Sequence, residues 1–399
     1  MSMKADLLNP ELGYFDEGNN LTNLEFFESA TRVFGDATVL PPVTYRSKVF
    51  AELENEKLWT RSWIPIGLLQ QIPDPGDLLP FTVGFHGVHV QRNMDGSISA
   101  RFNSHQHGGC RFVPEQCRTG SQTKCSIASC NYTRDSDVIK SGEDGSNTDP
   151  MYKFLGVNPD KLVPVNCETW GSFILINLDP NCQSLSTGLE GIPDILIKRL
   201  FHHSHIYGSK WLDFLSNWKH SGQTLSNMFS GSKSEKPDFS WDGEQVLTPA
   251  YIMEKINLPA KIRVLTGGYD QAIFCWLFPN LLMVVSETHT ACVILQATSM
   301  GKSLHRIFLL GSATLPAEEQ RSLLDAWLEI FREIGSEAEK LQKASEKWGT
   351  ASLPETSIDT LPIELRLAAY TMQKYLVSRV IEKHEYYWNA PIMDARFLG

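Results

Sequence analysis

The spacing of apolar residues divides the chain into a part rich in short strands and a later part with helices around a sheet. Between residues 43 and 63, apolar positions recur at helical spacing. Strand-like runs bounded by turn residues follow at 78–85, 87–93, 97–103 and 169–177. We therefore predict a polar N-terminal arm over residues 1–42 and a small β domain over residues 43–183.

The remaining residues, 184–399, predict a second domain of the α+β class. Residues 185–230 have a helical pattern, and a long amphipathic helix begins just after residue 314. A further helix is expected over residues 363–382. Between the helices lie apolar runs that predict an antiparallel sheet, at 261–270, 272–280, 281–289, 291–299 and 306–313.

Composition narrows the classes of function. The 399 residues are 42% hydrophobic and 21% charged, as in an ordinary globular protein, and the net charge of −10 argues against nucleic acid as a partner. No apolar stretch is long enough to span a membrane. The N-terminus lacks the apolar core of a signal peptide, so we expect a cytoplasmic protein with reduced cysteines.

Three sets of residues together resemble a known family. They are the entry segment around 59–110, the Asn217-Trp218-Lys219 tripeptide and the strand Trp276-Leu277-Phe278-Pro279-Asn280. In this order they resemble α subunits of Rieske-type non-haem iron oxygenases, which include choline-monooxygenase-like and aromatic-ring-hydroxylating enzymes. The resemblance covers roughly residues 40–390. It implies a Rieske-like β domain, a helix-grip (START-like) catalytic domain and two metal sites.

The first of these sites is a [2Fe–2S] cluster held by two cysteines and two histidines. The family pattern is Cys-x-His, followed after about 17 residues by Cys-x-x-His. At the matching positions, His105 replaces the first cysteine and Ala128 replaces the second histidine. We expect this cluster to be lost. His105, His107 and Cys125 could still hold a structural zinc ion, and the alternative is that they are remnant loop residues.

The second site is a mononuclear iron bound by two histidines and a carboxylate. The family places the histidine pair 10–20 residues after Asn217-Trp218-Lys219, but the first histidine after His220 is His289. Gln223 and Asn227 stand where the family has acidic residues. The register of the third ligand stays open between Glu337 and Glu339. We therefore expect a protein without metal or cofactor.

An apolar pocket with a few hydrogen-bonding groups would remain, which is the usual composition of a small-molecule site. Our hypothesis is a cofactor-independent biosynthetic enzyme, such as a cyclase, an isomerase or a dehydratase, acting on an apolar small molecule. The candidate catalytic residues are Gln223, Asn227, Glu287 and His289. The candidate substrate-binding residues are Trp218, His220, Thr224, Met228, Phe229, Trp276, Phe278 and Asn280.

Other interpretations stay open at this point. Aromatic residues at helix and strand spacing are most often core residues, so the pocket residues could simply be packed. The chain could be a non-catalytic subunit that stabilises a partner, or an oxygenase with non-standard metal ligands. The resemblance also implies a homo-oligomer, possibly a trimer.

Overall fold

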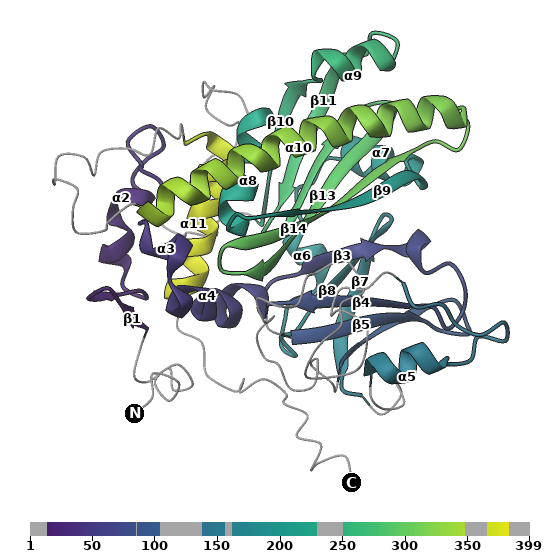
Figure 1. Ribbon diagram of the computed structural model, residues 1–399, viewed down its shortest axis with the longest axis horizontal. Coiled ribbons are helices and arrows are strands. Elements are labelled where there is room, and N and C mark those ends of the chain that lie inside the picture. Colours follow the sequence, from purple (N-terminus) through teal and green to yellow (C-terminus); the bar gives the residue numbers. More distant parts are fainter. Residues whose placement is uncertain are drawn as a thin grey trace. The chain divides into compact units, whose positions relative to one another are not determined.

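In a computed structural model of the protein, the structure describes residues 14–84, 86–103, 138–155, 162–229, 250–347 and 365–382 (Figure 1). The chain forms two compact units. One combines the described residues up to Leu58 with those from Ser186 to Glu382, and we call it the α+β unit. The other spans Trp59–Leu185, and we call it the β unit. The α+β class predicted from the sequence is confirmed, whereas the predicted domain boundaries stay a prediction.

The β unit is built on one antiparallel sheet with the strand order β3-β8-β7-β6-β5-β4. The apolar runs of the sequence match β4, β5, β6 and β8, whereas β3 and most of β7 were not predicted as strands. The turn between β5 and β6 is closed by hydrogen bonds between Asn93 and Ser97. A short helix, α5 (Asp149–Leu155), lies between β6 and β7 in the sequence. The strands are β3 (Ile64–Leu68), β4 (Leu78–Val83), β5 (His86–Arg92), β6 (Ile98–Phe102), β7 (Pro164–Trp170) and β8 (Phe173–Asn177).

The α+β unit contains a second antiparallel sheet, with the order β10-β11-β12-β13-β14-β9. Its central strands are buried on both faces, which explains their nearly continuous apolar sequences. The strands are β9 (His205–Phe214), β10 (Tyr251–Asn257), β11 (Gln271–Leu277), β12 (Leu281–Val285), β13 (His289–Ser299) and β14 (Lys302–Gly311).

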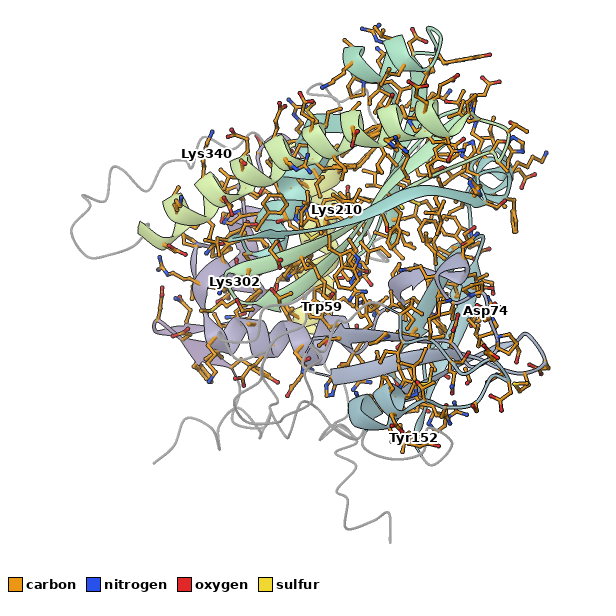
Figure 2. The ribbon with its side chains drawn as sticks, turned by 45° about the vertical axis from the view of Figure 1, so that its right-hand side comes forward. Trp59, Asp74, Tyr152, Lys210, Lys302 and Lys340 are labelled. Atoms are coloured by element: carbon orange, nitrogen blue, oxygen red, sulfur yellow. The ribbon has the colours of Figure 1, made fainter. Side chains whose placement is uncertain are left out.

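Helices α8 (Trp218–Phe229) and α10 (Ala317–Lys347) pack on this sheet and on each other. In Figure 1, α10 crosses the sheet as one long helix, and its first turn carries Glu318 and Glu319, which suit the positive end of the helix dipole. Side chains fill the space between α10 and the strands (Figure 2). Trp327 and Phe331 are buried on the apolar face that the sequence predicted.

The N-terminal helices and the last helix complete the α+β unit. Helix α11 (Leu367–Ile381) packs against α8 and against α2 (Glu28–Thr31). Gln373 of α11 donates hydrogen bonds to the backbone carbonyls of Ala30 and Thr38. The other N-terminal elements are the hairpin β1 (Phe15–Asp16) and β2 (Asn19–Asn20), the 3-10 turn η2 (Leu24–Phe27), and helices α3 (Val43–Arg46) and α4 (Lys48–Glu54).

Two local predictions were wrong. Residues 185–230 were expected to be helical, but after α6 (Leu185–Gly188) and α7 (Asp194–His202) the edge strand β9 intervenes. β9 pairs only with β14 and is half exposed, so its sequence carries little apolar signal. Residues 261–270 were expected to be a strand, but helix α9 (Ala260–Leu265) forms after Pro259, a residue that suits a helix start.

Close packing of α10 on β9 depends on Gly335, where a Cβ atom would run into the ring of Phe214. We expect Gly335→Leu to lower the free energy of unfolding by about 1–3 kcal/mol, because the added side chain overpacks this contact. Ser336→Leu, at the neighbouring exposed position, is the matched control and should leave stability nearly unchanged. Urea unfolding of the two variants tests this, and equal stability would contradict the packing role.

Candidate functional site

The N-terminal end of α8 is fixed by hydrogen bonds to three distant segments. The Asn217 side chain donates to the backbone carbonyls of Tyr45, at 3.2 Å, and Met300, at 2.8 Å. Its oxygen accepts the backbone N–H of Lys219 at 3.0 Å, which caps the helix. The Asn217 backbone N–H donates to Gln342 of α10 at 2.9 Å. The tripeptide that carried the family resemblance therefore anchors the helix.

A buried ion pair lies beside this anchor. The Lys219 Nζ atom is 2.7 Å from Glu54 Oε1, and the side chains are only 1% and 5% exposed. The Trp218 indole N–H donates to the other carboxylate oxygen of Glu54 at 3.3 Å. Burial lowers the pKa of Lys219 and raises the pKa of Glu54, and their mutual attraction opposes each shift. Trp218 is thus a structural partner of Glu54 in this arrangement.

The next residue of α8, His220, is also buried and makes a polar contact. Its ring stacks on Tyr45 with 4.0 Å between the ring centroids, and its Nε2 atom lies 2.8 Å from Ser345 Oγ. Burial, followed by the charge of Lys219, lowers the pKa of His220 to about 3, so the ring is neutral. Thr224 donates its hydroxyl to the carbonyl of His220 within the helix.

The second half of α8 carries the remaining predicted residues in different surroundings. Gln223 is buried, and its Nε2 atom has no hydrogen-bond partner among the described residues. The backbone carbonyl of Asn227 accepts a hydrogen bond from Arg366. Met228 is 49% exposed and points away from the interior, whereas Phe229 is buried. Met228, which the sequence suggested as a substrate-binding residue, therefore does not face the interior.

Phe229 lines a small apolar cavity between α8, α10 and the sheet. The cavity volume is about 10 Å³, roughly the space for one water molecule. No charged side chain is among the described residues that line it. The lining residues are Leu225, Phe229, Phe274, Leu282, Met283, Val284, Ala291, Val293 and Phe331.

The predicted residues of the strand Trp276–Asn280 are core residues near this site and do not line the cavity. The Trp276 indole N–H donates to the carbonyl of Pro279 at 3.0 Å. Phe278 packs on Tyr375 of α11, with 5.4 Å between the ring centroids. The Asn280 amide donates to the carbonyl of Leu295 at 3.1 Å and so ties neighbouring strands together.

Glu287 and His289 lie at the turn between β12 and β13, and they face different surroundings. The Glu287 side chain is exposed. His289 is fully buried, with Nδ1 3.0 Å from Ser286 Oγ and Nε2 accepting the indole N–H of Trp327 at 2.9 Å. Burial, followed by the nearby His203, lowers the pKa of His289 to about 3. The structure therefore does not bring Glu287 and His289 together as an acid–base pair.

Sequence analysis missed a buried cluster of hydroxyls beside α8. Ser221 Oγ lies 2.8 Å from the hydroxyls of Ser216 and Ser303, and Ser303 lies 3.5 Å from His305 Nε2. Burial lowers the pKa of His305 to about 3. Glu54 was missed as well. No spacing pattern marks them, because Ser221 and Ser303 are 82 residues apart in the sequence and Glu54 and Lys219 are 165 residues apart.

The architecture is that of the α subunits of Rieske-type non-haem iron oxygenases. A quaternary ammonium Rieske monooxygenase matches with a TM-score of 0.57 at 14% identity, over 90% of this chain and 98% of the other. Naphthalene 1,2-dioxygenase from Rhodococcus sp. matches with a TM-score of 0.58 at 14% identity, over 95% of this chain and all of the other. At this level of identity the likeness establishes the fold.

Relatives in sequence agree with this class. The α subunit of benzene 1,2-dioxygenase from Pseudomonas putida is 26% identical over 152 residues, which are 38% of this chain and 32% of the relative. The carnitine monooxygenase oxygenase subunit from Acinetobacter baumannii is 23% identical over 160 residues, or 40% and 42% of the two chains. The matches thus span less than half of these relatives. No family model matches the chain.

These relatives overturn the functional prediction made from the sequence. They are oxygenases, and nothing among them supports a cofactor-independent cyclase, isomerase or dehydratase. The prediction of no cofactor is wrong for the same reason, because oxygenases of this class use a Rieske cluster and a non-haem iron. The error lay in the step from missing ligands to a different chemistry. The relatives are enzymes, so a non-catalytic subunit gains no support.

The described residues of α8 do not fit the two-histidine, one-carboxylate iron site of this class. No histidine lies between His220 and His289 in the sequence. The Glu339 carboxylate accepts the backbone N–H of Leu215 at 2.8 Å, and Glu337 is exposed and paired with Lys340. Across the part of the chain that the structure describes, no three His, Cys, Asp or Glu side chains are grouped to hold a metal ion.

The possible zinc ligands His105, His107 and Cys125 lie outside the described residues. Their donor types, imidazole and thiolate, are those that bind iron–sulfur clusters and zinc. The prediction that they hold a metal therefore stays a prediction. Among the described residues, no helix combines the length and the apolar character needed to cross a membrane.

The Lys219–Glu54 pair yields a direct test of how α8 is held. We expect Glu54→Gln to lower the free energy of unfolding by about 3–5 kcal/mol, because it leaves a buried ammonium without its counter-charge. The double variant Glu54→Gln/Lys219→Met should recover much of this loss. Glu337→Gln removes an exposed pair and should have little effect. Urea unfolding measures all three, and a silent Glu54→Gln would contradict the buried pair.

The buried histidines predict acid sensitivity. Burial lowers the pKa of His305 to about 3, below the ordinary value of 6.5, so the unfolded state takes up the proton first as the pH falls. The stability contributed by the neutral ring is complete above pH 6.5 and is lost as the pH falls towards 3. The loss for this group is about 2 kcal/mol at pH 5.

Urea unfolding at neutral pH and at about pH 5, for the wild type and for His305→Gln, tests this expectation. The variant should lose about 2 kcal/mol less than the wild type between the two conditions. His220 and His289, whose pKa values are lowered in the same direction, keep the wild-type trend in both proteins. Identical pH dependence of the two proteins would show that His305 does not contribute.

Proposed function

We propose that the chain is an oxidoreductase of the oxygenase type that acts on an apolar organic molecule bound between α8 and the sheet of the α+β unit. The oxygenase relatives support the reaction class. The observation that carries the substrate class is the lining of the cavity, which consists of aliphatic and aromatic side chains. Such a surface gains free energy when it covers apolar surface and contributes no ionic contact.

The same lining argues against the charged substrates named for some relatives. Carnitine and glycine betaine each carry a carboxylate, which needs a cation or several hydrogen-bond donors when it leaves water. Within the described part of the chain, no Lys or Arg lines the cavity. An uncharged molecule such as benzene, the substrate named for another relative, suits this surface better. The proposed substrate is therefore apolar and uncharged.

The described residues are assigned binding and enclosure of the substrate. Redox chemistry in this class is supplied by the iron–sulfur cluster and the iron. Because the described part of α8 does not fit the iron site, no oxygen-activating step is assigned to it. We also propose that the chain forms a homo-oligomer, with a trimer as the state to test. The net charge of −10 disfavours a nucleic-acid partner.

The test uses the full chain purified without oxygen or chelator. Protein reduced with dithionite is mixed with benzene and ¹⁸O-labelled dioxygen, so that no partner reductase is needed. We expect labelled oxygen in a hydroxylated product. Glycine betaine is the matched charged probe and should give no labelled product. Folded protein that yields no labelled product from benzene would contradict the proposal.

A further inference from the structure

The apolar cavity is smaller than the substrates that its lining would suit. Its volume is about 10 Å³, whereas an apolar cavity that binds benzene in another protein measures about 150 Å³. A ligand can therefore enter only if at least one lining side chain moves. The following inference rests on the proposed function, because it concerns ligand binding in the same cavity.

The lining residues differ in how firmly they are held. Phe274, Leu282 and Val293 lie on central strands whose backbones are paired on both sides. Phe331 lies in the middle of α10, with helix on either side. Phe229 is the most exposed of the lining side chains, at 8% compared with 0% for Phe274 and 2% for Phe331. Among the lining residues, Phe229 is therefore the large side chain that is packed least completely.

The Phe229 ring occupies a place suited to another aromatic ring. Its centroid lies 5.9 Å from that of Phe274 in a stacked arrangement and 6.0 Å from that of Trp327. Both partners are fully buried, and Trp327 is fixed through its hydrogen bond to His289. If the Phe229 side chain rotates away, a flat apolar ligand can make the same contacts with Phe274 and Trp327.

The backbone near Phe229 is held from outside the helix. Arg366, the residue just before α11, donates a hydrogen bond to the carbonyl of Asn227, two residues before Phe229. This hydrogen bond fixes the backbone of α8 close to Phe229. The motion that can make room for a ligand is therefore rotation of the Phe229 side chain.

We propose that Phe229 determines the size of the ligand that this cavity admits. In the wild type, a ligand must displace the Phe229 ring, which limits the ligand to about the volume of one aromatic ring. Shortening the side chain joins its volume to the existing cavity and admits a two-ring molecule.

The test compares binding of benzene and naphthalene by isothermal titration calorimetry to the wild type, Phe229→Ala and Phe229→Leu. We expect Phe229→Ala to bind naphthalene at least about tenfold more tightly than the wild type, with Phe229→Leu between them. Phe278→Ala removes another buried ring, one that is not among the lining residues of the cavity, and it should match the wild type. Circular dichroism establishes that each variant is folded.

The outcomes separate this inference from the proposed function. If wild type and Phe229→Ala bind naphthalene equally, Phe229 does not set the size limit, although the cavity still binds apolar ligands. If Phe278→Ala gains as much as Phe229→Ala, the effect is general loosening and the inference is wrong. If the folded wild type and all folded variants bind neither probe, the substrate class under the proposed function is wrong as well.

Discussion

The buried contact between Lys219 and Glu54 determines where helix α8 lies, and the candidate site depends on α8. Each charge would be costly to bury alone, so the two side chains must meet whenever the helix is packed against α4. The pair contributes little net stability compared with two apolar residues. Its value lies in excluding alternative positions of the helix, because any shift that separates the charges leaves both without a partner in an interior site.

The two ends of α8 therefore make different kinds of contacts. The first turns are surrounded by polar partners from three distant segments, each of which accepts only one geometry. The last turns face strands and α10 through apolar contacts, which are not directional and tolerate repacking. The first turns of α8 are therefore fixed in position, and they make no contact with the cavity. The helix is adaptable at the end that lines the cavity, where a ligand would have to be accommodated.

Sequence patterns predicted the parts of the fold in which burial alone decides. Strands β11 to β14 are apolar on both faces, and the buried stripe of α10 has a clear helical period. β9 and α9 were wrong because an edge strand and a six-residue helix carry weak patterns. Gln223, Thr224 and Phe229 were predicted to lie on one helix, and all three lie on α8. Glu54 could not be predicted, since only tertiary folding brings it to Lys219.

The residues that hold α8 and the residues that would serve chemistry occupy different positions along it. Asn217, Trp218 and Lys219 make the contacts that fix the fold, so replacing them leaves buried polar partners without hydrogen bonds. Gln223 has no hydrogen-bond partner for its Nε2 atom among the described residues, so substitution there costs the fold less. The same backbone can therefore be maintained while the chemical groups on the second half of the helix change. The fold therefore identifies the class of protein more directly than it identifies the side chains that carry out its chemistry.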